Sequence, residues 1–114
     1  MNFNNFTIKS QEAVQQAVNL VQTNGQQAVE PEHLLAGILK VGENVTNFIF
    51  QKLGMNGQQI ATVLDRQIAS LPKVSGGEPY LGRDTNNVLQ KAVEYSKELG
   101  DEFVSLEAIQ RLCA

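Results

Sequence analysis

The sequence has 114 residues, which is enough for one domain with a modest hydrophobic core. Its nine basic and twelve acidic residues give a net charge of −3, which argues against nucleic acid as the main partner because phosphate binding requires concentrated lysine and arginine. No apolar run approaches the roughly 18 residues of a membrane span, so we expect no membrane partner. The start lacks a signal peptide, and the single Cys113 fits a reducing compartment. We therefore expect a cytoplasmic protein.

The first half of the chain contains four segments with helical periodicity, at about 8–24, 31–41, 45–53 and 57–71. Thr7 and Asn56 stand where an N-cap is expected for the first and fourth helices. Pro31 suits the first position of the second helix, where its missing N–H costs nothing. Gly54 is expected to end the third helix in a left-handed conformation, and Pro72 to end the fourth.

The second half begins with a stretch, 72–83, that is rich in glycine and proline and is expected to be a mobile linker. Two further helical patterns follow, at about 85–99 and 105–113. Asp84 or Thr85 is a suitable cap for the first of them, and Ser105 for the second. No segment has the period-2 alternation of a strand, so the predicted fold is all-α. Apolar residues at helical spacing are expected to face the core, among them Val14, Val21, Leu34, Ile38, Phe48, Leu53, Val63, Leu64, Leu89, Leu99 and Ile109.

A short turn occurs twice in the chain, at 25–33 and at 100–108. In each copy a glycine, Gly25 or Gly100, stands where a helix should stop, and glycine adopts the left-handed C′ conformation without a Cβ penalty. The separation is 75 residues, and the same offset aligns Gln15 with Gln90, Ala17 with Ala92, Val18 with Val93, Val29 with Val104 and Glu32 with Glu107. One helix–turn–helix unit is therefore expected to be present twice.

The duplication predicts a single pseudo-two-fold domain over residues 1–114. Its first repeat is expected at 7–71, the linker at 72–83 and the second repeat at 84–114. Nothing in the sequence after Ala114 corresponds to 45–71, so the second repeat is expected to be truncated. With only two copies, the pattern indicates a globular domain and not a solenoid.

Several strings in the sequence are similar to those of one known family. Phe6 and Thr7 lead into the first helix, VEPEHLL stands at 29–35, and GDEFVSLEA stands at 100–108. This arrangement resembles the double Clp repeat at the N-terminus of the Hsp100/Clp AAA+ unfoldases. Within that family it looks most like the ClpB disaggregases, with the ClpC type as the alternative. One departure is Ala108, which stands where the first copy has His33.

The resemblance implies a non-catalytic, substrate-binding N-terminal domain. It would capture unfolded or aggregated polypeptides for the AAA+ ring of an ATP-dependent, homohexameric disaggregase of the stress response. The chain contains no glycine-rich phosphate-binding motif, so ATP and Mg²⁺ are expected only in AAA+ modules outside it, and no cofactor is expected in this domain. Adaptor proteins are a second class of partner in the family, and a ClpC-type domain would bind them in preference to unfolded clients.

The resemblance also implies where a client would bind. Transferred position by position, the site would be an apolar groove with a polar rim of Thr7, Asp101 and Glu107 and a floor of Leu89, Val93, Tyr95 and Phe103. Some of these residues could have a structural role instead of a binding role. Thr7 is a good N-cap, and the carboxylate of Glu107 would interact favourably with its helix dipole. Leu89 and Val93 lie on an apolar stripe that is typical of a core, whereas Tyr95 and Phe103 suit a contact surface.

Two functions of other classes are compatible with the sequence. A small enzyme could use His33 with Cys113, but no orienting third residue or oxyanion-hole motif accompanies them. A lone histidine near a helix start is more often a hydrogen-bonded structural residue, and a lone cysteine on an apolar stripe is more often a buried hydrophobe. A single cysteine also excludes a Cys-based zinc cluster made by one chain. The second alternative is a purely structural, dimerising helical domain.

Overall fold

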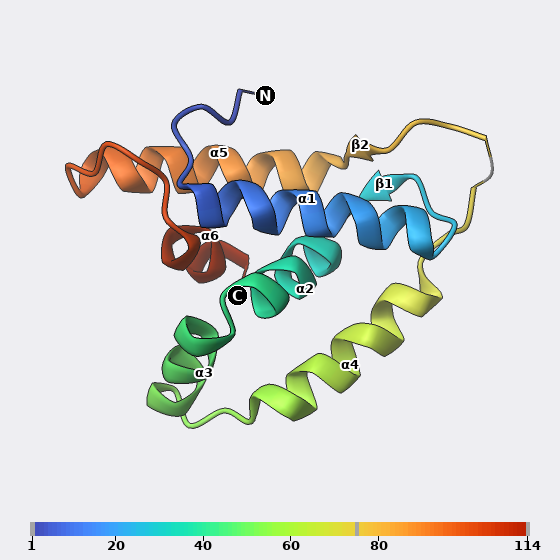
Figure 1. Ribbon diagram of the computed structural model, residues 1–114, viewed down its shortest axis with the longest axis horizontal. Helices are drawn as coiled ribbons and strands as arrows, with labels where there is room; N and C mark the ends of the chain where they lie inside the picture. Colours follow the sequence, from blue (N-terminus) through green and yellow to red (C-terminus); the bar gives the residue numbers. More distant parts are fainter. Residues whose placement is uncertain (1, 75, 114) are drawn as a thin grey trace.

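The computed structural model describes residues 2–74 and 76–113. The elements in this part of the chain are α1 (Ile8–Thr23), β1 (Ala28–Val29), α2 (Pro31–Val41), α3 (Glu43–Lys52), α4 (Gly57–Ser70), β2 (Tyr80–Leu81), α5 (Arg83–Glu98) and α6 (Leu106–Cys113) (Figure 1). The all-α prediction is confirmed, with two short strands that no sequence pattern indicated. Met1, Ser75 and Ala114, which belong to the predicted domain, linker and second repeat, lie outside the described residues.

Three of the predicted helix caps are formed by side chains. The Thr7 hydroxyl accepts a hydrogen bond of 3.1 Å from the backbone N–H of Ser10, and Asn56 Oδ1 accepts one of 2.9 Å from Gln58. The Ser105 hydroxyl accepts from the N–H of Ala108 at 3.2 Å. Each bond pairs one of the N–H groups that a helix start leaves without a partner, which is why these residue types mark the starts in the sequence.

The predicted cap of the fifth helix is wrong. α5 begins at Arg83, and its N-cap is Gly82, so neither Asp84 nor Thr85 caps it. A Cβ atom at position 82 would collide with the carboxylate of Glu30, so the close approach of the two repeats favours glycine over a capping side chain. α3 also begins two residues before its predicted start.

The duplicated turns have the same backbone geometry. Gly25 and Gly100 have φ angles of 66° and 77°, which confirms the predicted left-handed conformation. In both turns the next N–H donates to the carbonyl five residues earlier, Gln26 to Val21 at 2.9 Å and Asp101 to Ser96 at 2.8 Å. This pattern is the Schellman motif, and it ends α1 and α5 in the same way.

Each repeat pairs with the turn of the other repeat. β1 and β2 are parallel, with Val29 opposite Leu81, and an isolated parallel bridge joins Phe6 to Val104. Both members of the second pair are offset by 75 residues from members of the first, so the two pairs are equivalent. The backbone bonds match as well, from Gly82 N–H to the Val29 carbonyl at 2.9 Å and from Thr7 N–H to the Val104 carbonyl at 3.0 Å.

Two buried hydroxyl groups reinforce these pairs. Ser10 donates to the carbonyl oxygen of Val104 at 3.0 Å, and Thr85 donates to that of Val29 at 2.6 Å. Both side chains are fully buried, and they too are 75 residues apart. Each carbonyl already accepts a backbone N–H, so the hydroxyl adds a second hydrogen bond to the same oxygen. Thr85 is therefore turned inward and is not available as a cap.

The core lies where α1, α2, α5 and α6 meet, and Ala13, Leu34, Ile38, Leu89, Ala92 and Ile109 are fully buried in it. Four residues predicted to face inward are exposed instead, namely Phe48 (58%), Leu53 (63%), Val63 (49%) and Leu99 (57%). Phe48 and Val63 lie outside the buried faces of α3 and α4, and Leu53 and Leu99 are the C-cap residues of α3 and α5. The predicted inward positions are therefore wrong beside the buried faces and at the helix ends.

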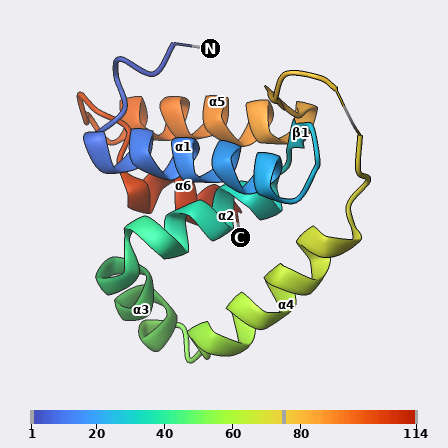
Figure 2. The same ribbon diagram turned by 45° about the vertical axis from the view of Figure 1, so that its right-hand side comes forward.

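α1 and α5 run side by side in both views, with α2 and α6 beneath them (Figures 1 and 2). α3 and α4 extend away from these four helices as a V-shaped arm (Figure 2). The arm, residues 43–70, packs against the rest of the described chain mainly through α2. This leaves the apolar inner side of the arm facing α5 and α6 across a gap.

Candidate functional site

A large apolar cleft of about 660 Å³ lies between the arm and the second repeat. One wall comes from α2, α3 and α4 and the other from the end of α5 and from α6. The lining residues are Leu35, Ile49, Phe50, Leu53, Met55, Ile60, Tyr95, Leu99, Ser105, Glu107, Ala108, Gln110 and Arg111. Because Leu53 and Leu99 are more than half exposed, the cleft presents apolar surface to the solvent.

Only two of the lining residues carry a charge, Glu107 and Arg111. The guanidinium of Arg111 lies over the ring of Tyr95, 5.4 Å from its centroid, a distance at which a cation is attracted to an aromatic face. This contact holds the arginine against the cleft wall. The cleft therefore resembles a site that buries apolar groups and has polar groups at its margin.

Exposed acidic residues gather beside the cleft, at the end of α5, in the following loop and at the start of α6. They are Glu94, Glu98, Asp101, Glu102 and Glu107, all exposed, against exposed Lys97 in the same stretch and exposed Arg111 on the cleft wall. Like charges at this density produce a negative potential over the cleft margin. A positively charged group on a ligand would be attracted there.

The structure brings some of the sequence-predicted site residues together. Tyr95 and Glu107 line the large cleft. Glu107 also lines a neighbouring crevice of about 530 Å³, which it shares with Thr7, Lys9 and Ser105. Thr7 additionally donates to the hydroxyl of Ser10 at 2.9 Å, so its capping role and its position beside Glu107 coexist.

The other predicted site residues lie outside the cleft lining. Leu89 is fully buried in the core and offers no surface to a ligand, and Val93 is half-buried against the same core. Asp101 and Phe103 lie in the loop between α5 and α6, and Phe103 is 47% exposed. The loop adds charge and an aromatic ring to the margin of the site, whereas the floor is made by other residues.

The wall that the first repeat contributes was not predicted from the sequence. Leu35, Ile49, Phe50, Met55 and Ile60 face the cleft from α2, α3, the following turn and α4. Their apolar spacing predicts a core, and no local signal distinguishes a core stripe from a cleft wall. One signal in the sequence could have indicated this wall. Apolar residues cluster near the turn between α3 and α4, where Leu53 and Met55 are exposed, and exposed apolar clusters often mark binding surfaces.

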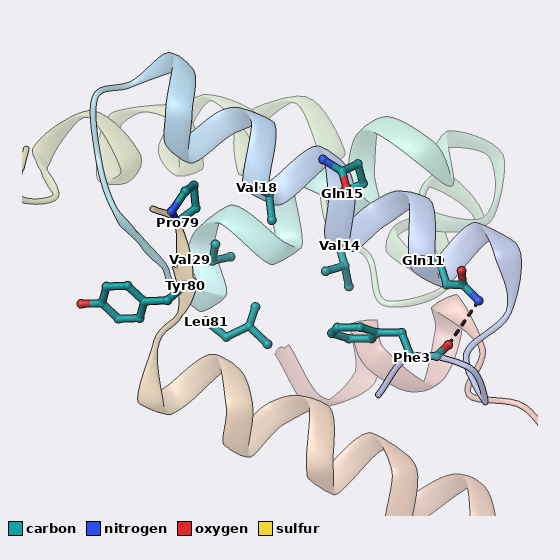
Figure 3. Close-up of a pocket in the computed structure, with 9 residues that line it drawn as sticks. All are labelled: Phe3, Gln11, Val14, Gln15, Val18, Val29, Pro79, Tyr80 and Leu81. Carbon is teal, nitrogen blue, oxygen red and sulfur yellow. Dashed lines mark hydrogen bonds between the residues drawn. The ribbon is translucent and has the colours of Figure 1, made fainter. Parts of the chain in front are cut away.

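A second hollow, of about 480 Å³, lies between α1, the N-terminal segment and β2 (Figure 3). Val14, Val18, Val29 and Leu81 form its floor, and Gln11 donates to the carbonyl of Phe3 at 3.2 Å beside it (Figure 3). None of its nine lining residues is charged. It contains none of the predicted site residues, so the large cleft is the better candidate.

His33 is fully buried and is hydrogen-bonded through both ring nitrogens. The N–H of Glu30 donates to His33 Nδ1 at 2.9 Å, so the ring proton is on Nε2, which donates to Gln26 Oε1 at 2.7 Å. Gln26 Nε2 in turn donates to the carbonyl of Ile68 at 2.6 Å. We call this chain of bonds the histidine relay, and it ties the first turn to the end of α4.

The relay rules out a catalytic pair of His33 with Cys113, because neither ring nitrogen is free to accept a proton from the thiol. Burial also raises the pKa of the Cys113 thiol to about 12, so the reactive thiolate is absent near neutral pH. Among the described residues, no three His, Cys, Asp or Glu side chains form a group that could hold a metal ion. Within residues 2–74 and 76–113, none of the helices combines the length and the hydropathy of a membrane span.

The relay predicts that the protein loses stability as the pH falls from 7.5 to 5.5. Burial lowers the pKa of His33 below the usual 6.5, so the unfolded chain takes up a proton first and unfolding is favoured below that pH, by about 1 kcal/mol per pH unit. Burial, Glu32 and Asp84 raise the pKa of Glu30, so the folded state binds that proton first as the pH falls, and the resulting slope of opposite sign ends near pH 4.5. Thermal unfolding across the window should show the loss in the wild type, and His33→Gln should flatten it; equal slopes would contradict the prediction.

A family model decides the relationship of this chain to known proteins. The model described as the Clp repeat (R) N-terminal domain matches residues 5–109. The chain belongs to this family. The Clp repeat domain is 80% identical over 109 residues to the chaperone protein ClpB of Bacteroides thetaiotaomicron and 55% identical to that of Porphyromonas gingivalis. Each alignment covers 96% of this chain and 13% of the relative, so the chain spans about an eighth of their length.

Solved structures agree on the fold of this Clp repeat domain. The Hsp104 N-terminal domain of Candida albicans matches with a TM-score of 0.86 at 16% identity, over 96% of this chain and 73% of that one. The N-terminal domain of the ClpV1 ATPase of E. coli matches with a TM-score of 0.86 at 20% identity, over 94% and 66%. At such identities the likeness establishes the helical architecture alone.

Proposed function

We propose that this Clp repeat domain is the non-catalytic, client-binding N-terminal domain of a ClpB-type disaggregase. The observation that carries the proposal is the large cleft, which exposes apolar side chains beside a negatively charged margin. High identity to ClpB chaperones over nearly the whole chain supports it. The clients would be unfolded or aggregated polypeptides, because these expose the apolar segments that folded proteins bury.

An apolar cleft binds such segments without reading their sequence. Burial contributes about 25 cal/mol for each Å² of apolar surface removed from water. Part of that free energy is offset by the ordering of the client on binding. Binding in the high micromolar range, or about 5–6 kcal/mol, would hold a client long enough for transfer and still allow release to the ring.

The acidic margin would add a preference for basic residues next to the apolar segment. Glu107 lies at the cleft itself, and Asp101 lies in the adjoining loop. Both are exposed, so their effect on a client should depend on ionic strength. Rim charges of this kind mainly change the association rate and its dependence on salt.

The relatives found favour the ClpB type over an adaptor-binding ClpC type. ATP and Mg²⁺ would then be bound by AAA+ modules outside this chain, in a homohexamer of the whole protein. A cytoplasmic location follows from the same assignment. Adaptor proteins are a further class of partner for this surface. An adaptor would bind in its folded state, whereas a client would bind only when it is unfolded.

The margin is tested by Asp101→Asn with Glu107→Gln in one variant. We expect affinity for reduced, carboxymethylated α-lactalbumin with a basic tag to fall about fivefold at low salt, because two exposed charges contribute about 1 kcal/mol together. A matched control is Glu12→Gln with Asp65→Asn, which removes two exposed acidic groups from α1 and α4. Fluorescence anisotropy measures the affinity of both variants. Equal losses of affinity in the two variants would contradict the assignment of the site to this margin. If the wild type did not bind the unfolded protein, the proposed function itself would be contradicted.

A further inference from the structure

Gln110 is a buried amide without a hydrogen-bond partner. It lies on α6, is 5% exposed, and lines the large cleft. Neither its Oε1 nor its Nε2 has a partner within residues 2–74 and 76–113. Buried side-chain amides are nearly always paired, and an unpaired one is unfavourable in the folded state. The exception requires a reason.

Packing alone does not explain why an amide occupies this position, because the first repeat has an apolar residue at the equivalent position. The offset of 75 residues relates Gln110 to Leu35, and both line the large cleft, from α6 and α2 respectively. Leucine is close to glutamine in size and has no polar atoms. The two repeats therefore face one cleft with a leucine on one side and an amide on the other.

A glutamine side chain matches one peptide unit of an extended chain. It offers one acceptor oxygen and an NH₂ donor, so it can pair with a backbone N–H and a backbone C=O at once. Such pairing reads no sequence, but it requires backbone groups that are not already bonded. In a helix the backbone groups are paired internally, whereas an unfolded segment has both groups free.

We propose that Gln110 is the specificity-determining residue of the large cleft, and that it pairs with the backbone of an extended, apolar client segment. This inference rests on the client-binding function proposed above. The torsions of the glutamine side chain allow its amide to turn from its enclosed position into the cleft when a client enters. The cleft walls then bury the client's apolar side chains while Gln110 distinguishes extended from helical segments.

The test compares Gln110→Leu, the residue found at the equivalent position of repeat one, with the wild type. The probe is a fluorescein-labelled, lysine-flanked leucine peptide, together with a series in which each central amide is replaced in turn by an ester. We expect Gln110→Leu to unfold at an equal or higher temperature but to bind the peptide about tenfold more weakly. One ester should weaken binding to the wild type, and no ester should weaken binding to the variant.

Two further variants separate the loss of the amide from other effects of substitution. Gln110→Met retains length without the amide and should behave like Gln110→Leu. The control Gln22→Leu makes the same exchange at an exposed position of α1 outside the cleft lining and should leave the affinity and the ester pattern of the wild type intact. If Gln110→Leu binds the peptide as the wild type does, with the same ester pattern, the inference fails and the proposed function stands. A lower unfolding temperature with unchanged affinity would show a purely structural role. If the wild type binds neither the peptide nor unfolded α-lactalbumin, both proposals fail.

Discussion

Replacing Gly37 by alanine is expected to destabilise the protein by about 3 kcal/mol, because it separates two helices that touch through their backbones. Gly37 is buried on α2. A Cβ atom there would collide with the carbonyl oxygen of Ala13 and lie 3.2 Å from the backbone nitrogen of Ala17, both on α1. A flexible side chain could move aside, but the backbone of α1 cannot without disturbing the core around Ala13. The unfolding temperature should fall by about 10 °C or more.

The matched control is Gly57→Ala, at the start of α4. The nearest atom to a Cβ there is a ring carbon of Phe50 at 3.2 Å, which can move slightly, and alanine favours the helix more than glycine does. We expect a change within about 1 kcal/mol for this variant. Thermal unfolding followed by circular dichroism measures both. Equal stability of Gly37→Ala and the wild type would mean that α1 and α2 are not locked at this point.

The parts of the fold that the sequence predicted well are those fixed by local hydrogen bonds. Thr7, Asn56 and Ser105 cap helices because their side chains reach N–H groups two or three residues later. Gly25 and Gly100 end helices because the left-handed conformation is strained for other residues. In each case the partner lies within a few residues, so a short stretch of sequence contains the whole interaction.

The parts that could not be predicted depend on residues far apart in the chain. Thr85 looks like a cap, but it donates to a carbonyl that lies 56 residues earlier. The 75-residue offset aligns Thr85 with Ser10, and that match was the available signal for an equivalent role. Leu53 and Leu99 look like core residues, yet they border the large cleft, because burial is decided by which element covers a stripe and not by the stripe itself.

The same limit applies to the candidate site. The family resemblance placed Tyr95 and Glu107 at a groove, and the structure has both on the cleft wall. It could not supply Leu35 or Gln110, since both line a cleft that only the folded arm completes. Apolar periodicity describes one helix at a time, whereas a cleft is a property of several.

The two copies of the turn have diverged in a way that separates scaffold from surface. In the first copy Gln26 and His33 form the histidine relay. The 75-residue offset replaces them by Asp101, which is exposed, and Ala108, which is buried. The first turn therefore has bonds that hold the end of α4, while the second has a charged residue beside the cleft. The second turn has no equivalent of the relay, and its exposed Asp101 contributes to the acidic margin.

If the relay holds the arm in place, then Gln26→Leu should be among the most destabilising changes in the chain, at about 3 kcal/mol. Gln26 is 6% exposed and is the only link between the ring of His33 and the carbonyl of Ile68 within the described residues. Leucine would leave the buried Nε2–H of His33 unpaired, which costs about 1–3 kcal/mol. It would also remove one of the two hydrogen bonds of the Ile68 carbonyl, which keeps the bond from Leu71 N–H at 3.1 Å. The control Gln27→Leu removes an exposed 3.2 Å bond to Glu78 and should change stability by less than about 0.5 kcal/mol. Urea unfolding of the two variants measures the difference in stability. Equal midpoint concentrations of urea would mean that α4 is held by apolar packing alone.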